Sequence, residues 1–163
     1  MLLTIHEGHV PGCIGRITQL HADHYASSNG FGLAFEAKVA RELADFCLGY
    51  KPGRDGIWLA QYNGSIEGSI VIDGSNAGTA GAHLRWFITS DAIRGCGVGK
   101  QLLERAIEFA QSRDYKTIYL WTFSGLEAAR HLYESCGFQL TQESPGSQWG
   151  TLVNEQRFER SAA

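Results

Sequence analysis

A glycine-rich turn, Arg94-Gly-Cys-Gly-Val-Gly99, carries the clearest chemical signal in the sequence. It follows a β-rich stretch at residues 83–89 and precedes a stretch at residues 98–110 whose apolar positions recur with the spacing of a helix face. Residues without a Cβ let several backbone N–H groups converge, and the positive end of a helix favours an anion there. We therefore expect the turn to bind a phosphate or pyrophosphate.

Two familiar nucleotide motifs do not fit this turn. A dinucleotide fingerprint that starts at Gly95 needs a third glycine where the chain has Lys100. A P-loop that ends at Gly99-Lys100 needs glycine and Ser/Thr where the chain has Arg94 and Gln101. These mismatches argue against an NAD- or ATP-binding protein. A glycine-rich turn with no ligand remains the simplest alternative.

A second motif, Leu132-Tyr-Glu-Ser-Cys-Gly-Phe138, follows one strand–helix unit later. Gly137 is suited to end the helix before it in the left-handed conformation. With these two motifs the chain resembles the GCN5-related N-acetyltransferases. That family carries Arg/Gln-x-x-Gly-x-Gly at its coenzyme A pyrophosphate site and Ala-x-x-Leu-Tyr-Glu-x-x-Gly-Phe at a helix-to-strand junction, matched here at Ala129–Phe138. The resemblance covers nearly the whole chain, and the first half is loosely similar to acetyltransferase domains fused to winged-helix (MarR-type) regulators.

The resemblance implies an enzyme that transfers an acetyl group from acetyl-CoA directly to a primary amine of a small molecule, a lysine or an N-terminus. Tyr133 matches the family position that borders the cofactor and protonates the departing thiolate, and a phenol with a pKa near 10 can donate to a thiolate with a pKa near 8.5. The other implied cofactor contacts, to the pyrophosphate and the pantetheine arm, are Phe87, Ile88, Thr89, Arg94, Gly95, Cys96, Gly97, Val98, Gly99, Lys100, Ser124 and Leu126. Leu126 stands where many relatives have an asparagine. The alternative function is a non-catalytic acyl-CoA-binding or sensing module, and the alternative role of Tyr133 is core packing.

The acceptor amine must lose a proton before it attacks, and two residues are candidate bases. His83 lies early on the 83–89 stretch, where relatives often carry an acidic base, and an imidazole ordinarily titrates near neutral pH. Glu36 lies in a helical region expected to border the acceptor. Both residues have a structural role as their alternative, and a chain of water molecules could replace a tethered base.

Charge and composition exclude several other classes of protein. The chain has 14 Lys+Arg against 17 Asp+Glu and no basic block, so no nucleic acid or anionic membrane partner is expected, and the acidic balance favours a cationic acceptor. No apolar run reaches the length of a membrane helix and no signal-peptide pattern is present, so we expect a cytoplasmic protein. The four cysteines include no Cys-x-x-Cys pair and are expected to be free thiols. The His6/His9 and His21/His24 pairs lack further ligands, so no metal is expected.

The pattern of elements predicts one domain over residues 1–163. The predicted order is strand, two helices, three strands, helix, strand, helix and two strands, with Asn63-Gly64 as a hairpin turn. Ser124 and Glu127 have the spacing of a capping box at the start of the last helix. This order favours an α/β (α+β) fold similar to that of the family, with a mixed, mostly antiparallel central sheet of about seven strands and helices on both faces. Such folds commonly form homodimers, and a homodimer is one expected state.

Overall fold

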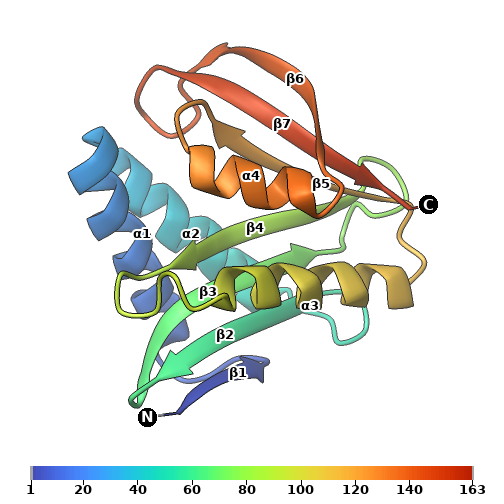
Figure 1. Ribbon diagram of the computed structural model, residues 1–163, viewed down its shortest axis with the longest axis horizontal. Helices are drawn as coiled ribbons and strands as arrows, with labels where there is room; N and C mark the ends of the chain where they lie inside the picture. The colour runs from blue at the N-terminus through green and yellow to red at the C-terminus, as the bar shows by residue number, and fades with distance from the viewer. Residues whose placement is uncertain (1, 163) are drawn as a thin grey trace.

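The computed structural model describes residues 2–162, which form a seven-stranded sheet flanked by helices (Figure 1). Along the chain the elements are β1 (Leu3–Glu7), α1 (Cys13–Asn29), α2 (Leu33–Leu48), β2 (Gly56–Tyr62), β3 (Ser65–Asp73), β4 (Ala82–Thr89), α3 (Val98–Ser112), β5 (Thr117–Phe123), α4 (Glu127–Ser135), β6 (Gln139–Gly146) and β7 (Val153–Ser161). The strands lie in the order β1-β2-β3-β4-β5-β7-β6, and β4–β5 is the parallel neighbour pair in an otherwise antiparallel sheet. The predicted element order and fold class are confirmed.

Helices cover both faces of the sheet. Figure 1 shows α1 and α2 together on one face and α3 and α4 on the other. The apolar face of α3 that the sequence spacing predicted is buried against the sheet, and its residues are Val98, Leu102, Leu103, Ala106, Ile107 and Ala110. A second cluster joins α1 and α2 to the opposite face. No helix formed by residues 2–162 is long and apolar enough to cross a membrane.

The hairpin between β2 and β3 turns at Asn63-Gly64, as predicted. Both residues have positive φ, 52° for Asn63 and 78° for Gly64, and Tyr62 pairs with Ser65 across the turn. A two-residue turn with two left-handed residues twists in the same sense as the strands that it joins. The hairpin therefore fixes the register of the first half of the sheet.

Strand β4 contains a β-bulge. Ser69 pairs with Ile88 and Val71 pairs with Arg85, so two residues of β4 lie opposite one residue of β3. Trp86 at the bulge has a φ of 46°, and the Ser69 hydroxyl donates a hydrogen bond of 2.6 Å to its carbonyl oxygen. A bulge bends its strand and increases the local twist, so the second half of β4 is turned away from the line of its first half.

Strands β4 and β5 pair over two residues only. Ala82 pairs with Ile118 and His83 with Tyr119, and the two strands separate beyond these pairs. On its other side β4 pairs with β3 before and after the bulge, and β5 pairs with β7 along its whole length. The separation therefore leaves two unpaired strand edges that face each other inside the sheet.

The end of β4 is anchored by a half-buried carboxylate. Glu67 on β3 accepts hydrogen bonds from Arg16 of α1 at 2.8 Å and from the Ser90 hydroxyl at 2.6 Å. The Ser90 amide also donates to the Glu67 carbonyl at 2.7 Å. These bonds tie α1, β3 and the exit of β4 to one residue, so the loop that follows β4 starts from a fixed point.

The start of α4 differs from the sequence prediction. The helix begins at Glu127 after Leu126 and has no side-chain cap, so the predicted capping box is wrong. The Ser124 amide instead donates to the Asn154 carbonyl of β7 at 3.0 Å, and the chain then turns at Gly125 with a φ of 99°. Pairing with β7 therefore holds Ser124 one turn before the helix. The predicted left-handed end of α4 at Gly137 is confirmed by its φ of 92°.

Candidate active site

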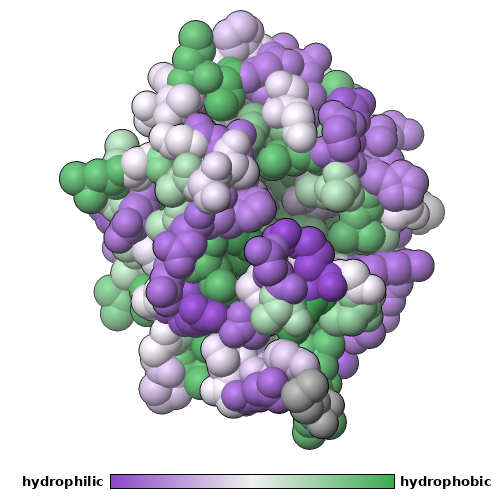
Figure 2. All heavy atoms as spheres, turned by 60° about the vertical axis from the view of Figure 1, so that its left-hand side comes forward, coloured by the Kyte–Doolittle hydropathy of each residue, from purple (hydrophilic) through white to green (hydrophobic). Residues whose placement is uncertain are grey.

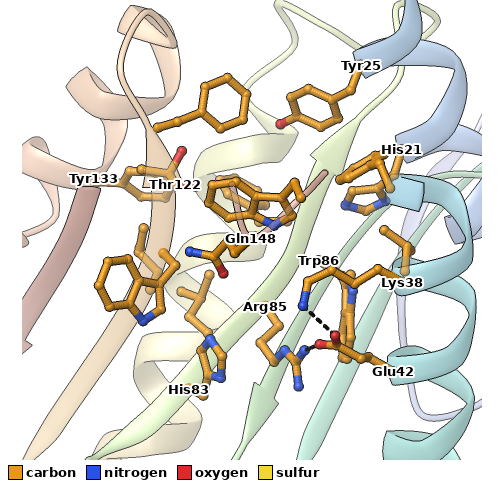
Figure 3. Close-up of a pocket in the computed structure, with 18 residues that line it drawn as sticks. His21, Tyr25, Lys38, Glu42, His83, Arg85, Trp86, Thr122, Tyr133 and Gln148 are labelled. Atoms are coloured by element: carbon orange, nitrogen blue, oxygen red, sulfur yellow. Dashed lines mark hydrogen bonds and ion pairs between the residues drawn. The ribbon is translucent and has the colours of Figure 1, made fainter. Parts of the chain in front are cut away.

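A cleft opens where β4 and β5 separate. Its volume is about 190 Å³, and its walls come from α1, α2, β4, β5, α4 and the loop between β6 and β7. The space-filling view in Figure 2 shows a hollow in the surface, with hydrophilic and hydrophobic side chains mixed around it. Figure 3 shows the side chains that line the cleft. The hydroxyls of Tyr25 and Tyr133 lie toward one end, and Lys38, Arg85 and His83 toward the other.

The glycine loop next to the cleft has the geometry of an anion site. Gly95 and Gly97 adopt left-handed conformations, with φ of 85° and 80°. The helix α3 begins at Val98 with no side-chain cap and no acidic residue in its first turn, and Gln101 donates the first backbone bond, to the Gly97 carbonyl at 3.2 Å. Among residues 2–162, the amides of residues 98–100 therefore have no backbone acceptor. The loop thus presents free backbone N–H groups at the start of a helix, and anion binding there stays a prediction.

The side chains of the loop lie at its rim. The Arg94 guanidinium donates to the Thr89 carbonyl at 3.1 Å and to the Asp91 carboxylate, and 51% of its side chain is exposed. Lys100 is exposed and lies 3.9 Å from Glu104 one turn further along α3. The Cys96 thiol donates to the Ile93 carbonyl. Two cations therefore remain within reach of an anion bound at the start of α3.

The close packing of α3 brings the loop to the cleft. A Cβ placed on Gly99 would lie 3.7 Å from Leu132 of α4 and 3.7 Å from Phe87 of β4. The Phe87 ring in turn lies 6.0 Å from the Tyr133 ring, measured between centroids. The glycine loop, the open edge of β4 and Tyr133 thus meet in one place, although their sequence positions span about a third of the chain. Ile88, between Phe87 and Thr89, points into the core and is 7% exposed.

Tyr133 is buried in an aromatic environment but its hydroxyl faces the cleft. The residue is 6% exposed, and its ring contacts Phe87, Phe138 and Phe158. Its hydroxyl has no hydrogen-bond partner among the described residues, and no described side-chain polar atom is both buried and unpartnered, so the hydroxyl is reachable from the cleft. Burial, with a smaller effect of Tyr25, raises the pKa of Tyr133 above its ordinary value. The hydroxyl is therefore protonated at neutral pH and free to donate.

The two candidate bases from the sequence lie in different places. His83 lines the cleft and stacks on Tyr119, with 4.5 Å between ring centroids. Burial, with the charges of Arg85 and Arg157, lowers the pKa of His83 to about 3, so the titration near neutral pH expected of it does not occur. Glu36 is exposed on α2 and does not line the cleft. The carboxylate that lines the cleft is Glu42, six residues further along the same helix.

His21 is a cleft residue that the sequence reasoning considered only as a metal ligand. It is 6% exposed, and its Nδ1 lies 2.8 Å from the Ile17 carbonyl. Because a carbonyl only accepts hydrogen bonds, Nδ1 carries the proton and Nε2 is left as an acceptor. Burial lowers the pKa of His21 to about 4, so the ring is neutral. Ile17 and His21 lie one turn apart on the same face of α1, so the helical spacing could have predicted that His21 is buried.

The chain matches the model of the acetyltransferase (GNAT) family over residues 18–138. It belongs to the GNAT family. It is 35% identical to N-acetylaspartate synthetase from Danio rerio over 76% of this chain and 44% of the relative, and 31% identical to N-acetyltransferase 8 from Rattus norvegicus over 63% of this chain and 48% of the relative. The chain thus spans less than half the length of these two relatives.

Solved structures of GNAT acetyltransferases share the fold over nearly the full length of the chain. A GNAT acetyltransferase from Staphylococcus aureus superposes with a TM-score of 0.76 at 20% identity and covers 98% of this chain and 99% of that one. A GNAT acetyltransferase from Elizabethkingia anophelis with acetyl-CoA bound superposes with a TM-score of 0.66 at 21% identity and covers 98% of both chains. At these identities the likeness establishes the GNAT fold.

The remaining predicted site residues of this GNAT chain lie at the edge of the cleft or outside it. Ser124 is exposed, and Leu126 packs against the aromatic cluster of Phe31, Phe35 and Phe123 rather than lining the cleft. All four cysteines are free thiols, as expected. Within residues 2–162, no group of three or more His, Cys, Asp or Glu side chains could hold a metal ion.

Proposed function

We propose that this chain is an acetyl-CoA-dependent N-acetyltransferase that acetylates a primary amine by direct attack on the thioester. The observation that carries the proposal is the Tyr133 hydroxyl, which is protonated, unpartnered and open to the cleft between the separated strands. The amine nitrogen forms a bond to the acetyl carbon, the C–S bond breaks, and the thiolate takes the Tyr133 proton. Water then returns a proton to the tyrosine.

Two parts of the chain hold acetyl-CoA in this proposal. The free amides at the start of α3, with Arg94 and Lys100 at the rim, bind the pyrophosphate. The pantetheine arm adds to the open edge of β4 at Phe87, Ile88 and Thr89, as an extended peptide adds to a sheet edge. Because the bulge redirects the backbone of β4, an amide there can point at the thioester carbonyl and stabilise the oxyanion.

The amine loses its proton to water in the cleft. His21 and His83 are both neutral, with pKa values lowered to about 4 and about 3, so they are weak bases but good hydrogen-bond acceptors. They orient the amine or the water that carries the proton away. Glu36 has no direct part, because it lies outside the cleft.

We place this activity in the cytoplasm, since four free cysteines suit a reducing compartment. The acceptor is a small molecule or a peptide amine, and acetyl-CoA is the cofactor. A homodimer is the proposed assembly.

The proposal is tested by calorimetry with acetyl-CoA, followed by mass-spectrometric detection of acetylated products over a broad panel of amines. We expect acetyl-CoA to bind, ATP and NAD not to compete, and at least one class of amine to be acetylated. Absence of acetyl-CoA binding would overturn the assignment. Binding without turnover of any amine would support the sensing module instead.

A further inference from the structure

Two cations and one carboxylate line the end of the cleft away from Tyr133. Glu42 of α2 accepts a hydrogen bond from Lys38 at 2.6 Å through one carboxylate oxygen and from Arg85 of β4 through the other. In Figure 3 dashed lines join the two cationic groups to the Glu42 carboxylate. Arg85 also stacks over the Trp86 ring, with 4.1 Å from its guanidinium carbon to the ring centroid. Both cations are therefore held in place.

The local charge at this end is positive. Lys38, Arg85 and Glu42 are the charged side chains that line the cleft, and both cleft histidines are neutral. Glu42 stays ionised, because the bonds and charges of Lys38 and Arg85 outweigh the effect of burial and lower its pKa. Arg157 also acts on the His83 ring, but it does not line the cleft and lies 3.2 Å from the Glu159 carboxylate. Asp73 lies 3.9 Å from Arg85 but does not line the cleft.

The cation end of the cleft also has free hydrogen-bond donors. Lys38 and Arg85 each use one donor on Glu42 and keep others. Gln148, Trp86, Trp121 and Trp149 also line the cleft, and their side-chain N–H groups donate to no acceptor within residues 2–162. The acceptors of the lining residues are the Nε2 atom of His21, one ring nitrogen of His83, the amide oxygen of Gln148, the hydroxyl oxygens of Tyr25, Thr122 and Tyr133, and the remaining lone pairs of Glu42. The free donors of the two cations favour a ligand that presents a negative charge to them.

We propose that the acceptor is a free amino acid whose carboxylate binds Lys38 and Arg85 while its amino group, near His21, faces the Tyr133 end of the cleft. This inference rests on the proposed function and names the substrate class of the same site. The cleft volume of about 190 Å³ suits a single amino acid, since sites for drug-sized ligands run from about 300 to 1,000 Å³. The net charge of −3 suggested a cationic acceptor, but the positive lining of the cleft favours an acceptor that carries a carboxylate.

The first experiment compares acceptors that differ only in the carboxylate. The probes are the twenty standard L-amino acids, their carboxamides and the corresponding amines without a carboxylate, assayed with saturating acetyl-CoA. We expect the preferred amino acid to exceed its carboxamide in kcat/KM by about tenfold to a hundredfold, which is the usual contribution of hydrogen bonds to a charged group. Carboxamides or simple amines that are used as well as the amino acid would overturn the inference.

The second experiment tests the two cations. Lys38→Met and Arg85→Met should each raise the KM for the amino acid by about tenfold and remove the preference over its carboxamide, with kcat and acetyl-CoA affinity little changed. Arg85→Lys keeps the charge beside Glu42 and should restore part of the preference, so it serves if Arg85→Met does not fold. Arg41→Met is the matched control, because Arg41 is exposed on α2 outside the cleft. Equal KM values in control and cleft variants would overturn the inference.

The outcomes separate this inference from the proposed function. Acetylation of neutral or cationic amines alone would leave the enzyme assignment in place and exclude the amino acid acceptor. Acetyl-CoA binding with no acetylation of any amine would remove the enzyme assignment, and the acceptor with it.

Discussion

Replacing Tyr133 with phenylalanine removes one hydroxyl from the cleft and leaves the ring packing in place. The ring keeps its contacts with Phe87, Phe138 and Phe158. The hydroxyl donates to no acceptor among the described residues, so no internal hydrogen bond is lost. We therefore expect the free energy of unfolding to change by less than about 1 kcal/mol, measured by urea denaturation.

The same change should reduce turnover. General acids contribute about a hundredfold to ten-thousandfold to a rate, and a thiol with a pKa near 8.5 is a tolerable leaving group without one. We therefore expect Tyr133→Phe to lose about a hundredfold in kcat, the low end of this range, or roughly 3 kcal/mol in the activation barrier. The dissociation constant for acetyl-CoA should be unchanged, because the lost group acts on the departing sulfur.

The pH dependence gives a second test of Tyr133. Because burial raises its pKa above the ordinary value of 10.0, the hydroxyl stays protonated through pH 10. The kcat of the wild-type protein should therefore show no loss from this group below pH 10, and the ratio of wild-type to variant kcat should be constant from pH 7 to 10. A folded variant with a kcat within about threefold of the wild type would refute the acid role. A large loss of acetyl-CoA affinity would instead identify the hydroxyl as a binding group.

Three further changes test the loop, a buried histidine and the bulge. Gly97→Ala strains a residue with a φ of 80°, so it should lower the free energy of unfolding by about 1 kcal/mol and weaken acetyl-CoA binding in calorimetry. Gly99→Ala is the control, because its Cβ meets only contacts of 3.7 to 3.9 Å and the variant should keep its stability. Equal stability of the two variants would contradict this prediction. Since burial lowers the pKa of His21 to about 4, the unfolded chain binds the proton first, so stability should fall by roughly 3 kcal/mol as the pH drops from 7 to 4. His21→Gln should flatten this part of the profile in urea denaturation, and an unaltered slope would count against the argument. Ser69→Ala removes the hydrogen bond to the Trp86 carbonyl, so it should lower the free energy of unfolding by about 1 kcal/mol and also weaken acetyl-CoA binding. Unchanged values of both would show that the bulge keeps its shape without this hydrogen bond.

Features with a local cause could be predicted from the sequence. The turn at Asn63-Gly64 and the end of α4 at Gly137 need positive φ, which these residue types adopt at low cost. The buried face of α3 follows from apolar residues at helical spacing. The glycine loop was identified for the same reason, because its conformation depends on the residues within it.

Features that depend on distant partners could not be predicted in this way. Trp86 has the left-handed φ of the bulge although a tryptophan carries no local preference for it, because pairing with β3 imposes it. The capping box failed because pairing with β7 holds Ser124. The contact between Glu42 and Arg85 joins residues 43 positions apart, on a helix and a strand that meet only in the fold. A count of charged residues over the whole chain therefore could not predict the charge of the cleft lining.

Because β4 and β5 separate, this protein has unpaired strand edges in the interior of its sheet as well as at its two outer strands. An exposed edge ordinarily invites a strand of another molecule, which leads to aggregation. Here residues of α1, α2 and the loop between β6 and β7 line the cleft at the gap, so their side chains cover part of this inner edge. The molecule thus keeps unpaired backbone groups available for binding at an edge that its own helices partly enclose.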